Sequence, residues 1–144
     1  MNKPLLVAAC AALLLAACER TQAVVAVASP NTPQPARNFM LFFGNDQALL
    51  TPDGDVVVHE AAGAAKANPN TRITVAGHAD SSGNTAYNQA LSERRAATVK
   101  AALIREGVNE AAISVVGRGE EQLLVSTRDG AREPKNRRVE IIVQ

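Results

Sequence analysis

Both cysteines of this chain, Cys10 and Cys18, lie near its start, and no cysteine follows them. The rest of the sequence therefore has neither a disulfide nor a cysteine metal site to stabilise a fold. Its length suffices for one modest core, built from Val, Ile, Leu and Ala because aromatic residues are only 3% of the sequence. The formal net charge is +1 with both signs dispersed, and no basic block indicates nucleic-acid binding. We expect a single domain that depends on hydrophobic burial.

The start of the chain has the pattern of an export signal. A charged start at Lys3 precedes an uncharged, alanine-rich run from Pro4 to Ala17, which is too short for a stable transmembrane helix. The string Leu-Ala-Ala-Cys that ends at Cys18 resembles the lipobox of bacterial lipoprotein precursors. The resemblance implies a cleaved signal peptide of residues 1–17 and lipid attachment to Cys18. The alternative is a plain secreted protein with a chance cysteine.

Residues 18–37 are predicted to form the lipidated cysteine and a tether. Three prolines in this segment disfavour a helix and favour an extended chain. Fully stretched, the tether could span roughly 60 Å at about 3.3 Å per residue, so it is a spacer between bilayer and domain. The small apolar run from Ala23 to Ala28 could instead pair as a strand. The folded domain is predicted over residues 38–144.

Strand and helix patterns alternate along this domain. The predicted order is strand 39–43, helix 52–67, strand 72–76, helix 85–106, strand 113–116, an irregular segment over 120–135 and strand 138–143. Residues 39–43 are apolar on both alternating faces, which predicts a central buried strand. Helices between strands predict an α/β fold, an α+β sandwich in which helices cover one face of a mixed sheet of about four strands.

Cap residues mark the start of the first predicted helix and the end of the second. Thr51 is the predicted N-cap of the first helix, with Pro52 as its first residue, and Gly107 ends the second. In the strand between the helices, alternation directs Ile73 and Val75 toward the core.

The second helix carries polar residues on its apolar face. At about 100° per residue, Asn88, Ser92 and Arg95 fall on the same side as Leu91 and Val99. An inward-facing arginine is unfavourable unless it has a partner. Arg95 therefore either pairs with a buried carboxylate or serves a polar pocket near the start of the helix.

Asp80 is the obvious companion of this arginine. It follows the second predicted strand, and the next loop returns the chain to the first turns of the helix, so Asp80 should lie near Arg95. One interpretation is a structural salt bridge between the two side chains. The other is a binding site in which the carboxylate takes an ammonium group and the guanidinium takes a carboxylate, an arrangement that suits a zwitterion.

Several ordered motifs resemble the OmpA-like C-terminal domain family. They are Gly77-His78-Ala79-Asp80, Gly83, Asn88, Leu91-Ser92, Arg95-Ala96, Gly117-Arg118-Gly119-Glu120 and Asn136-Arg137-Arg138-Val139-Glu140-Ile141. The resemblance covers residues 39–143, almost the whole predicted domain. With the lipobox and the tether, the whole chain resembles the peptidoglycan-associated lipoproteins.

The resemblance implies a non-catalytic domain without a cofactor that binds peptidoglycan non-covalently, through the diaminopimelate of the stem peptides. The family's aspartate and arginine fall on Asp80 and Arg95, which would each engage one pole of the free amino-acid end of diaminopimelate. The family's helix asparagine falls on Asn88. Ser82, in the loop after Asp80, is a further candidate for ligand binding.

Two candidates lie farther along the chain from this helix. Arg137 shares the parity of Val139 and Ile141 in the closing strand and is expected in the pocket, whereas Arg138 points the other way. The alternative for Arg137 is an ion pair at the edge of the core. Asp46, in the loop after the first strand, is expected on the pocket rim, and its alternative is a turn residue.

Three features depart from the family pattern. Ala79 stands where a threonine is usual, which removes a hydroxyl near the site. The turn at residues 44–46 lacks the aspartate that often follows the phenylalanines directly, and residues 122–125 are unusually apolar. We expect these departures to affect affinity and partner choice more than the class of ligand.

A metal site and an enzyme are competing interpretations. His78 and Asp80 are two residues apart, but His59 is the only other histidine and no third ligand is evident. We expect His78 to be a hydrogen-bonded structural residue. Ser81 and Ser82 lie beside Asp80, but nothing orders them as a catalytic triad, so we expect no enzymatic activity.

The cellular role follows from the resemblance. It implies a lipoprotein of a Gram-negative bacterium, anchored in the outer membrane through Cys18, that faces the periplasm and supports envelope integrity. Glu19 is not the aspartate that commonly retains lipoproteins in the inner membrane. The partner stays open between the Tol system and another envelope protein that the chain would regulate or scaffold. An exposed apolar loop at residues 123–125 would favour a protein partner.

Overall fold

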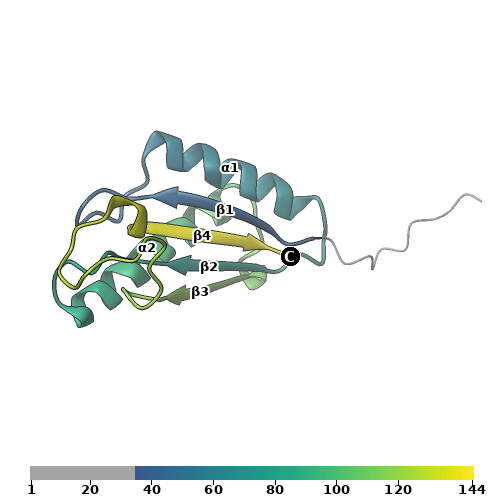
Figure 1. The fold of residues 1–144 in the computed structure, drawn as a ribbon. Coiled ribbons are helices and arrows are strands. Elements are labelled where there is room, and N and C mark those ends of the chain that lie inside the picture. Colours follow the sequence, from purple (N-terminus) through teal and green to yellow (C-terminus); the bar gives the residue numbers. More distant parts are fainter. Residues whose placement is uncertain (1–34) are drawn as a thin grey trace, which may run out of the picture. The chain divides into compact units, whose positions relative to one another are not determined.

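The computed structural model describes residues 35–144, in which two helices pack on a four-stranded sheet (Figure 1). The predicted signal peptide, the lipidation site Cys18 and most of the tether lie outside the described residues. The predicted domain limits at residues 17 and 37 stay predictions. Within the part of the chain that is described, neither helix is long and apolar enough to cross a membrane.

The order of elements matches the predicted alternation. The elements are β1 (Arg37–Phe42), α1 (Pro52–Lys66), β2 (Ile73–Gly77), α2 (Thr85–Arg105), η1 (Glu110–Ala112), β3 (Ile113–Gly117), η2 (Pro134–Asn136) and β4 (Arg138–Val143). The strands lie in the order β1-β4-β2-β3. β4 is antiparallel to β1 and β2, whereas β2 and β3 are parallel. The predicted mixed sheet and α/β class are confirmed.

A single aliphatic core lies between the sheet and both helices. Alternate residues of the inner strands face it, and the register places Val75 opposite Ile141. Ile73 and Val75 are buried, as their alternation predicted. The helices contribute mostly small residues: Val58, Ala61, Ala62 and Ala65 from α1, and Ala96, Val99, Ala102 and Leu103 from α2.

The caps that the sequence predicted are present. Thr51 accepts a hydrogen bond from the Gly54 N–H at 3.1 Å, and Pro52 is the first residue of α1. Asn84, which was not predicted as a cap, is the N-cap of α2 and accepts a hydrogen bond from the Ala86 N–H at 2.8 Å. Gly107 follows α2 with φ +89°, a conformation that favours glycine at the end of a helix.

The predicted central position of the first strand is wrong. β1 lies at an edge of the sheet and pairs only with β4. Leu41 faces the core, but Phe42 is 46% exposed on the opposite face. Phe43 lies just beyond the end of the strand, and its burial continues the alternation in which Leu41 faces the core and Phe42 faces away from it. The apolar run therefore mixes an edge strand with the first residue of a loop.

Gly77 sets how closely α2 approaches the sheet. A Cβ atom at this position would lie 2.0 Å from the Ser92 carbonyl oxygen, far inside contact distance. Only glycine lets the helix backbone lie directly on the end of β2. This contact places the first half of α2 beside the loop that carries Asp80.

Candidate functional site

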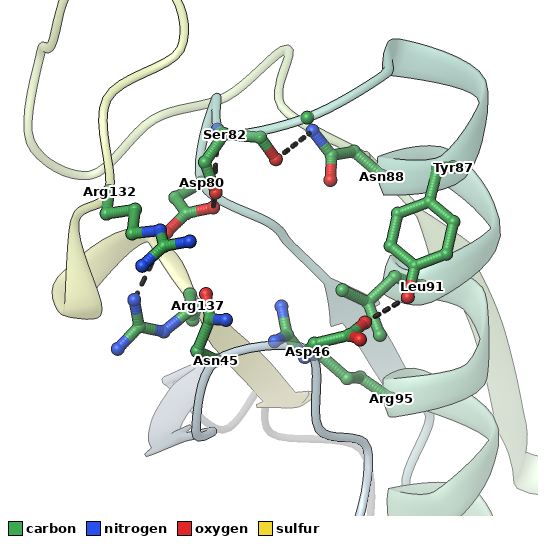
Figure 2. A pocket seen from close by; sticks show the side chains of 11 residues that line it. Asn45, Asp46, Asp80, Ser82, Tyr87, Asn88, Leu91, Arg95, Arg132 and Arg137 are labelled. Atoms are coloured by element: carbon green, nitrogen blue, oxygen red, sulfur yellow. Dashed lines mark hydrogen bonds and ion pairs between the residues drawn. The ribbon is translucent and has the colours of Figure 1, made fainter.

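A cavity of about 230 Å³ opens at the end of the sheet where β1 and β2 finish and β4 begins, beside the first turns of α2 (Figure 2). It is lined by Asn45, Asp46, Asp80, Ser82, Gly83, Tyr87, Asn88, Leu91, Arg95, Arg132 and Arg137. The structure thus brings all of the side chains predicted for ligand binding around one cavity. Cys18, the predicted lipidation site, lies outside the described residues.

Asp80 is a buried carboxylate with several donors. Ser82 Oγ donates to its Oδ1 at 2.6 Å. The Glu133 N–H and Arg137 Nη1 donate to its Oδ2 at 3.1 and 3.2 Å. Burial by itself opposes ionisation, but these hydrogen bonds hold the pKa of Asp80 below its ordinary value. Asp80 is therefore negatively charged at neutral pH.

Arg95 is fully buried at the inner end of the cavity. Its Nε donates to the Gln47 carbonyl at 2.8 Å, its Nη1 to the His78 carbonyl at 2.9 Å and its Nη2 to the Gly44 carbonyl at 3.1 Å. The guanidinium carbon also lies 5.4 Å from the centre of the Phe43 ring. Arg95 thereby ties the loop after β1 to the end of β2.

The interpretation of Asp80 and Arg95 as a salt bridge is wrong. Asp80 pairs with Arg137, whereas Arg95 uses backbone carbonyls and has no carboxylate at ion-pair distance within residues 35–144. Burial lowers the pKa of Arg95 to about 10, and the more distant charge of Asp80 partly opposes this shift. Arg95 stays protonated at neutral pH and leaves a positive potential at the inner end of the cavity.

The parity prediction for the closing strand is correct. Arg137 lines the cavity and pairs with Asp80, so it takes both of the places considered for it. Arg138 points to the other face of the sheet, where its Nη2 lies 2.8 Å from Glu140 Oε1 and its guanidinium donates to the Gln122 carbonyl. The alternation of a strand separated these two neighbouring arginines correctly.

Asp46 lies on the cavity rim, as expected, and contacts a residue that was not predicted. The Tyr87 hydroxyl donates to Asp46 Oδ1, and this hydrogen bond raises the pKa of Tyr87. Asp46 has φ 54°, the left-handed conformation that an aspartate tolerates in a turn. The pair joins the loop after β1 to α2 at the mouth of the cavity (Figure 2). The position of Tyr87 on α2, one turn before Leu91, is the signal that could have found it.

Asn88 links two loops around the cavity. Its side-chain amide is buried and donates to the Ser82 carbonyl at 3.2 Å and to Glu120 Oε2 at 2.6 Å. The loop after β2 is thereby held against the segment that follows β3. Asn88 has a structural role here in addition to any contact with a ligand.

The prediction that His78 is hydrogen-bonded is wrong. The ring is 2% exposed, yet neither nitrogen has a hydrogen-bond partner among the described residues. Glu140 Oε1 is 3.9 Å from Nε2, and Arg138 is also close. Because β2 ends at Gly77, strand alternation does not extend to Asp80, and the side chains of His78 and Asp80 have different neighbours.

The apolar loop at residues 123–125 is mostly covered. Leu124 is 47% exposed, but Leu123 and Val125 are half-buried. The buried Asn136 amide clamps this loop, because its Oδ1 accepts from the Val125 N–H and its Nδ2 donates to the Val125 carbonyl, both at 2.8 Å. One exposed leucine is ordinary for a protein surface and does not by itself indicate a protein partner.

Comparisons with known proteins agree with this fold. The OmpA family model matches residues 42–137. An outer membrane protein of Gluconacetobacter diazotrophicus is 46% identical over 77% of this chain and 31% of its own length. The peptidoglycan-associated lipoprotein of Legionella pneumophila is 37% identical over 78% of this chain and 64% of its own length. The chain therefore spans between about a third and two thirds of these curated relatives.

A solved structure gives the same result. The crystal structure of the peptidoglycan-associated lipoprotein from Burkholderia pseudomallei matches with a TM-score of 0.68 at 28% sequence identity. The match covers 74% of this chain and 90% of that one. The resemblance predicted from the sequence motifs is confirmed.

Proposed function

The chain belongs to the OmpA family, and we propose that its cavity binds peptidoglycan non-covalently through the diaminopimelate of the stem peptides. The observation that carries this proposal is that an ionised Asp80 and a buried, protonated Arg95 line the same open cavity without forming an ion pair with each other. The names of relatives from Legionella pneumophila and Burkholderia pseudomallei, both peptidoglycan-associated lipoproteins, support peptidoglycan as the ligand.

The chemistry of the cavity suits the free amino-acid end of diaminopimelate. Its ammonium group would bind Asp80, whose carboxylate is ionised and lies beside the hydroxyl of Ser82. Its carboxylate would lie toward Arg95, whose charge is not neutralised by a neighbouring carboxylate. Two opposite charges at a fixed separation select a zwitterion over a simple amine or a simple acid. Binding would proceed without turnover.

The proposed cellular role adds a second anchor. Lipid on Cys18 would hold the chain in the outer membrane, and the tether would carry the domain into the periplasm to reach the wall. Two modest affinities joined by a short spacer act together, because binding at one anchor raises the effective concentration at the other. The proposal includes an envelope protein as a second partner, either the Tol system or another protein that the chain would regulate or scaffold.

Co-sedimentation of the purified protein with diaminopimelate-type peptidoglycan tests the ligand. We expect wild type to sediment with the wall and Asp80→Asn to stay in solution. Asp129→Asn, the same change at an exposed loop position outside the cavity, should bind like wild type. Circular dichroism of each variant checks that the domain is folded.

Competition with small molecules sharpens this test. Free meso-diaminopimelate should release the protein from the wall, whereas Nα-acetyl-lysine amide, which has the side-chain ammonium group but no free carboxylate, should be much weaker. A wild-type protein that fails to bind, or a folded Asp80→Asn variant that binds normally, would overturn the assignment. Equal competition by Nα-acetyl-lysine amide would remove Arg95 from the proposed recognition.

A further inference from the structure

Arg132 lines the cavity but has no part in the proposal above. It lies in the irregular segment before β4, and its side chain is exposed. Within residues 35–144 it forms no ion pair, whereas Arg137 is paired with Asp80. Figure 2 shows the two arginines on the same side of the cavity, across from α2. The guanidinium of Arg137 is therefore neutralised by Asp80, whereas that of Arg132 has no neutralising partner within these residues.

The backbone on both sides of Arg132 is fixed to the loop after β2. The Gly130 N–H donates to the Ser81 carbonyl at 2.9 Å, and Ser81 Oγ donates to the Arg128 carbonyl at 3.0 Å. On the other side, the Glu133 N–H donates to Asp80 at 3.1 Å. Arg132 is thus exposed at its tip but anchored at its base, so a ligand would order only the side chain.

The charges around the cavity do not balance. The lining residues carry three arginines, at positions 95, 132 and 137, and two aspartates, at positions 46 and 80. Asp80 and Arg137 neutralise each other, and a zwitterionic ligand end adds no net charge. A ligand that is complementary to this cavity therefore carries one more negative charge than a zwitterion.

We propose that Arg132 forms a second anion subsite, which accepts another free carboxylate of the stem peptide beyond the amino-acid end of diaminopimelate. The inference rests on the proposed function, because the stem peptide is the ligand assumed there. Two carboxylates have this chemistry: the α-carboxylate of the neighbouring D-glutamate, and the carboxylate of diaminopimelate at its in-chain centre. A stem peptide in which the relevant carboxylate is amidated would bind more weakly.

Calorimetric titration of the full chain with three synthetic tripeptides tests this subsite. The first is L-alanyl-γ-D-glutamyl-meso-diaminopimelate with all carboxylates free. The second is amidated at the glutamate α-carboxylate, and the third at the in-chain carboxylate of diaminopimelate. We expect one of the two amidations to weaken binding by about tenfold, the lower range for a charge-assisted hydrogen bond. The amidation that weakens binding identifies which carboxylate the subsite takes.

The variant Arg132→Gln completes a double-mutant cycle. It should bind the free tripeptide about tenfold more weakly and lose the discrimination against the sensitive amide. Arg128→Gln, the same charge change at an exposed position in the same loop but outside the cavity, should behave like wild type. Loss of affinity in both variants would indicate a general charge effect and overturn the subsite.

The remaining outcomes separate the two proposals. Wild type that binds all three tripeptides equally, or Arg132→Gln that keeps the discrimination, overturns the subsite and leaves the diaminopimelate site intact. Wild type that binds none of the tripeptides overturns the proposed function, and the subsite with it.

Discussion

Replacing His78 by glutamine is expected to remove an acid sensitivity that the burial of this ring builds into the fold. Burial and the nearby Arg138 guanidinium lower the pKa of His78 from 6.5 to about 4, and Glu140 opposes the shift only in part. Arg118 adds to the lowering, and the Gln122 backbone, near the ring but outside hydrogen-bond geometry, opposes it. The folded protein therefore resists protonation of a ring that the unfolded chain protonates readily.

The sign and size of the effect of pH on the stability of the fold follow from proton linkage. Because the pKa is lower in the folded state, the unfolded state binds more protons between about pH 6.5 and pH 4, and stability falls as the pH falls through this window. At about 1.4 kcal/mol per pH unit, the loss is roughly 2 kcal/mol by pH 5 and roughly 3 kcal/mol by pH 4. Above about pH 7 the ring is neutral in both states and the effect vanishes.

Urea unfolding at about pH 7 and pH 5 measures this effect. With a slope of about 1–2 kcal/mol per molar, the wild-type midpoint should fall by roughly 1–2 M from the histidine alone. Glutamine has a similar volume and does not titrate, so His78→Gln should lose this part of the shift. His59→Gln is the control, because His59 is the other histidine and its side chain is 75% exposed. A His78→Gln variant with the full wild-type shift would refute the reasoning.

Three further predictions concern stability and are measured by urea or thermal unfolding at neutral pH. Thr51→Ala removes the N-cap hydrogen bond of α1 and should cost about 1 kcal/mol, so an unchanged midpoint would show that water replaces the cap. Gly77→Ala places a Cβ 2.0 Å from the Ser92 carbonyl and should cost about 3 kcal/mol or more, and a stable variant would mean that α2 can shift freely. Arg95→Lys keeps the charge but cannot reach the Gln47, His78 and Gly44 carbonyls together, so we expect a loss of about 3 kcal/mol; wild-type stability would contradict this role.

The helix boundaries could be predicted from the local sequence, because the residues that cap a helix are its immediate neighbours in the chain. Thr51 and Gly107 marked boundaries that the structure confirms. The position of a strand within a sheet depends instead on pairing between distant segments. Residues 39–43 looked like an inner strand, but the edge position of β1 is set by its pairing with β4, about a hundred residues later. Nothing in the short apolar run encodes that choice.

The sequence predicted many of the residues that line the candidate site, but not the hydrogen bonds and ion pairs that these residues form. The inward face of α2 and the family motifs brought Asp80 and Arg95 into one site, and both line the cavity. The partner of Asp80 is Arg137, 57 positions along the chain, and Arg95 bonds to backbone carbonyls that have no sequence signature. Arg132 lies in a segment without periodicity, so only the folded structure could place it.

The burial of each charged residue decides what its substitution can reveal about the ligand. Arg95 donates to three backbone carbonyls in two separate segments and is fully buried, so any loss of wall binding on its replacement combines a weaker fold with a lost contact. Replacing Asp80 should disturb the fold less than replacing Arg95 but more than replacing Arg132, because its removal leaves Arg137 without its partner. Arg132 is exposed and unpaired among the described residues, so its replacement should leave the fold unchanged. A change in affinity on replacing Arg132 therefore reports on the ligand alone, which makes this position the cleanest probe of what the cavity binds.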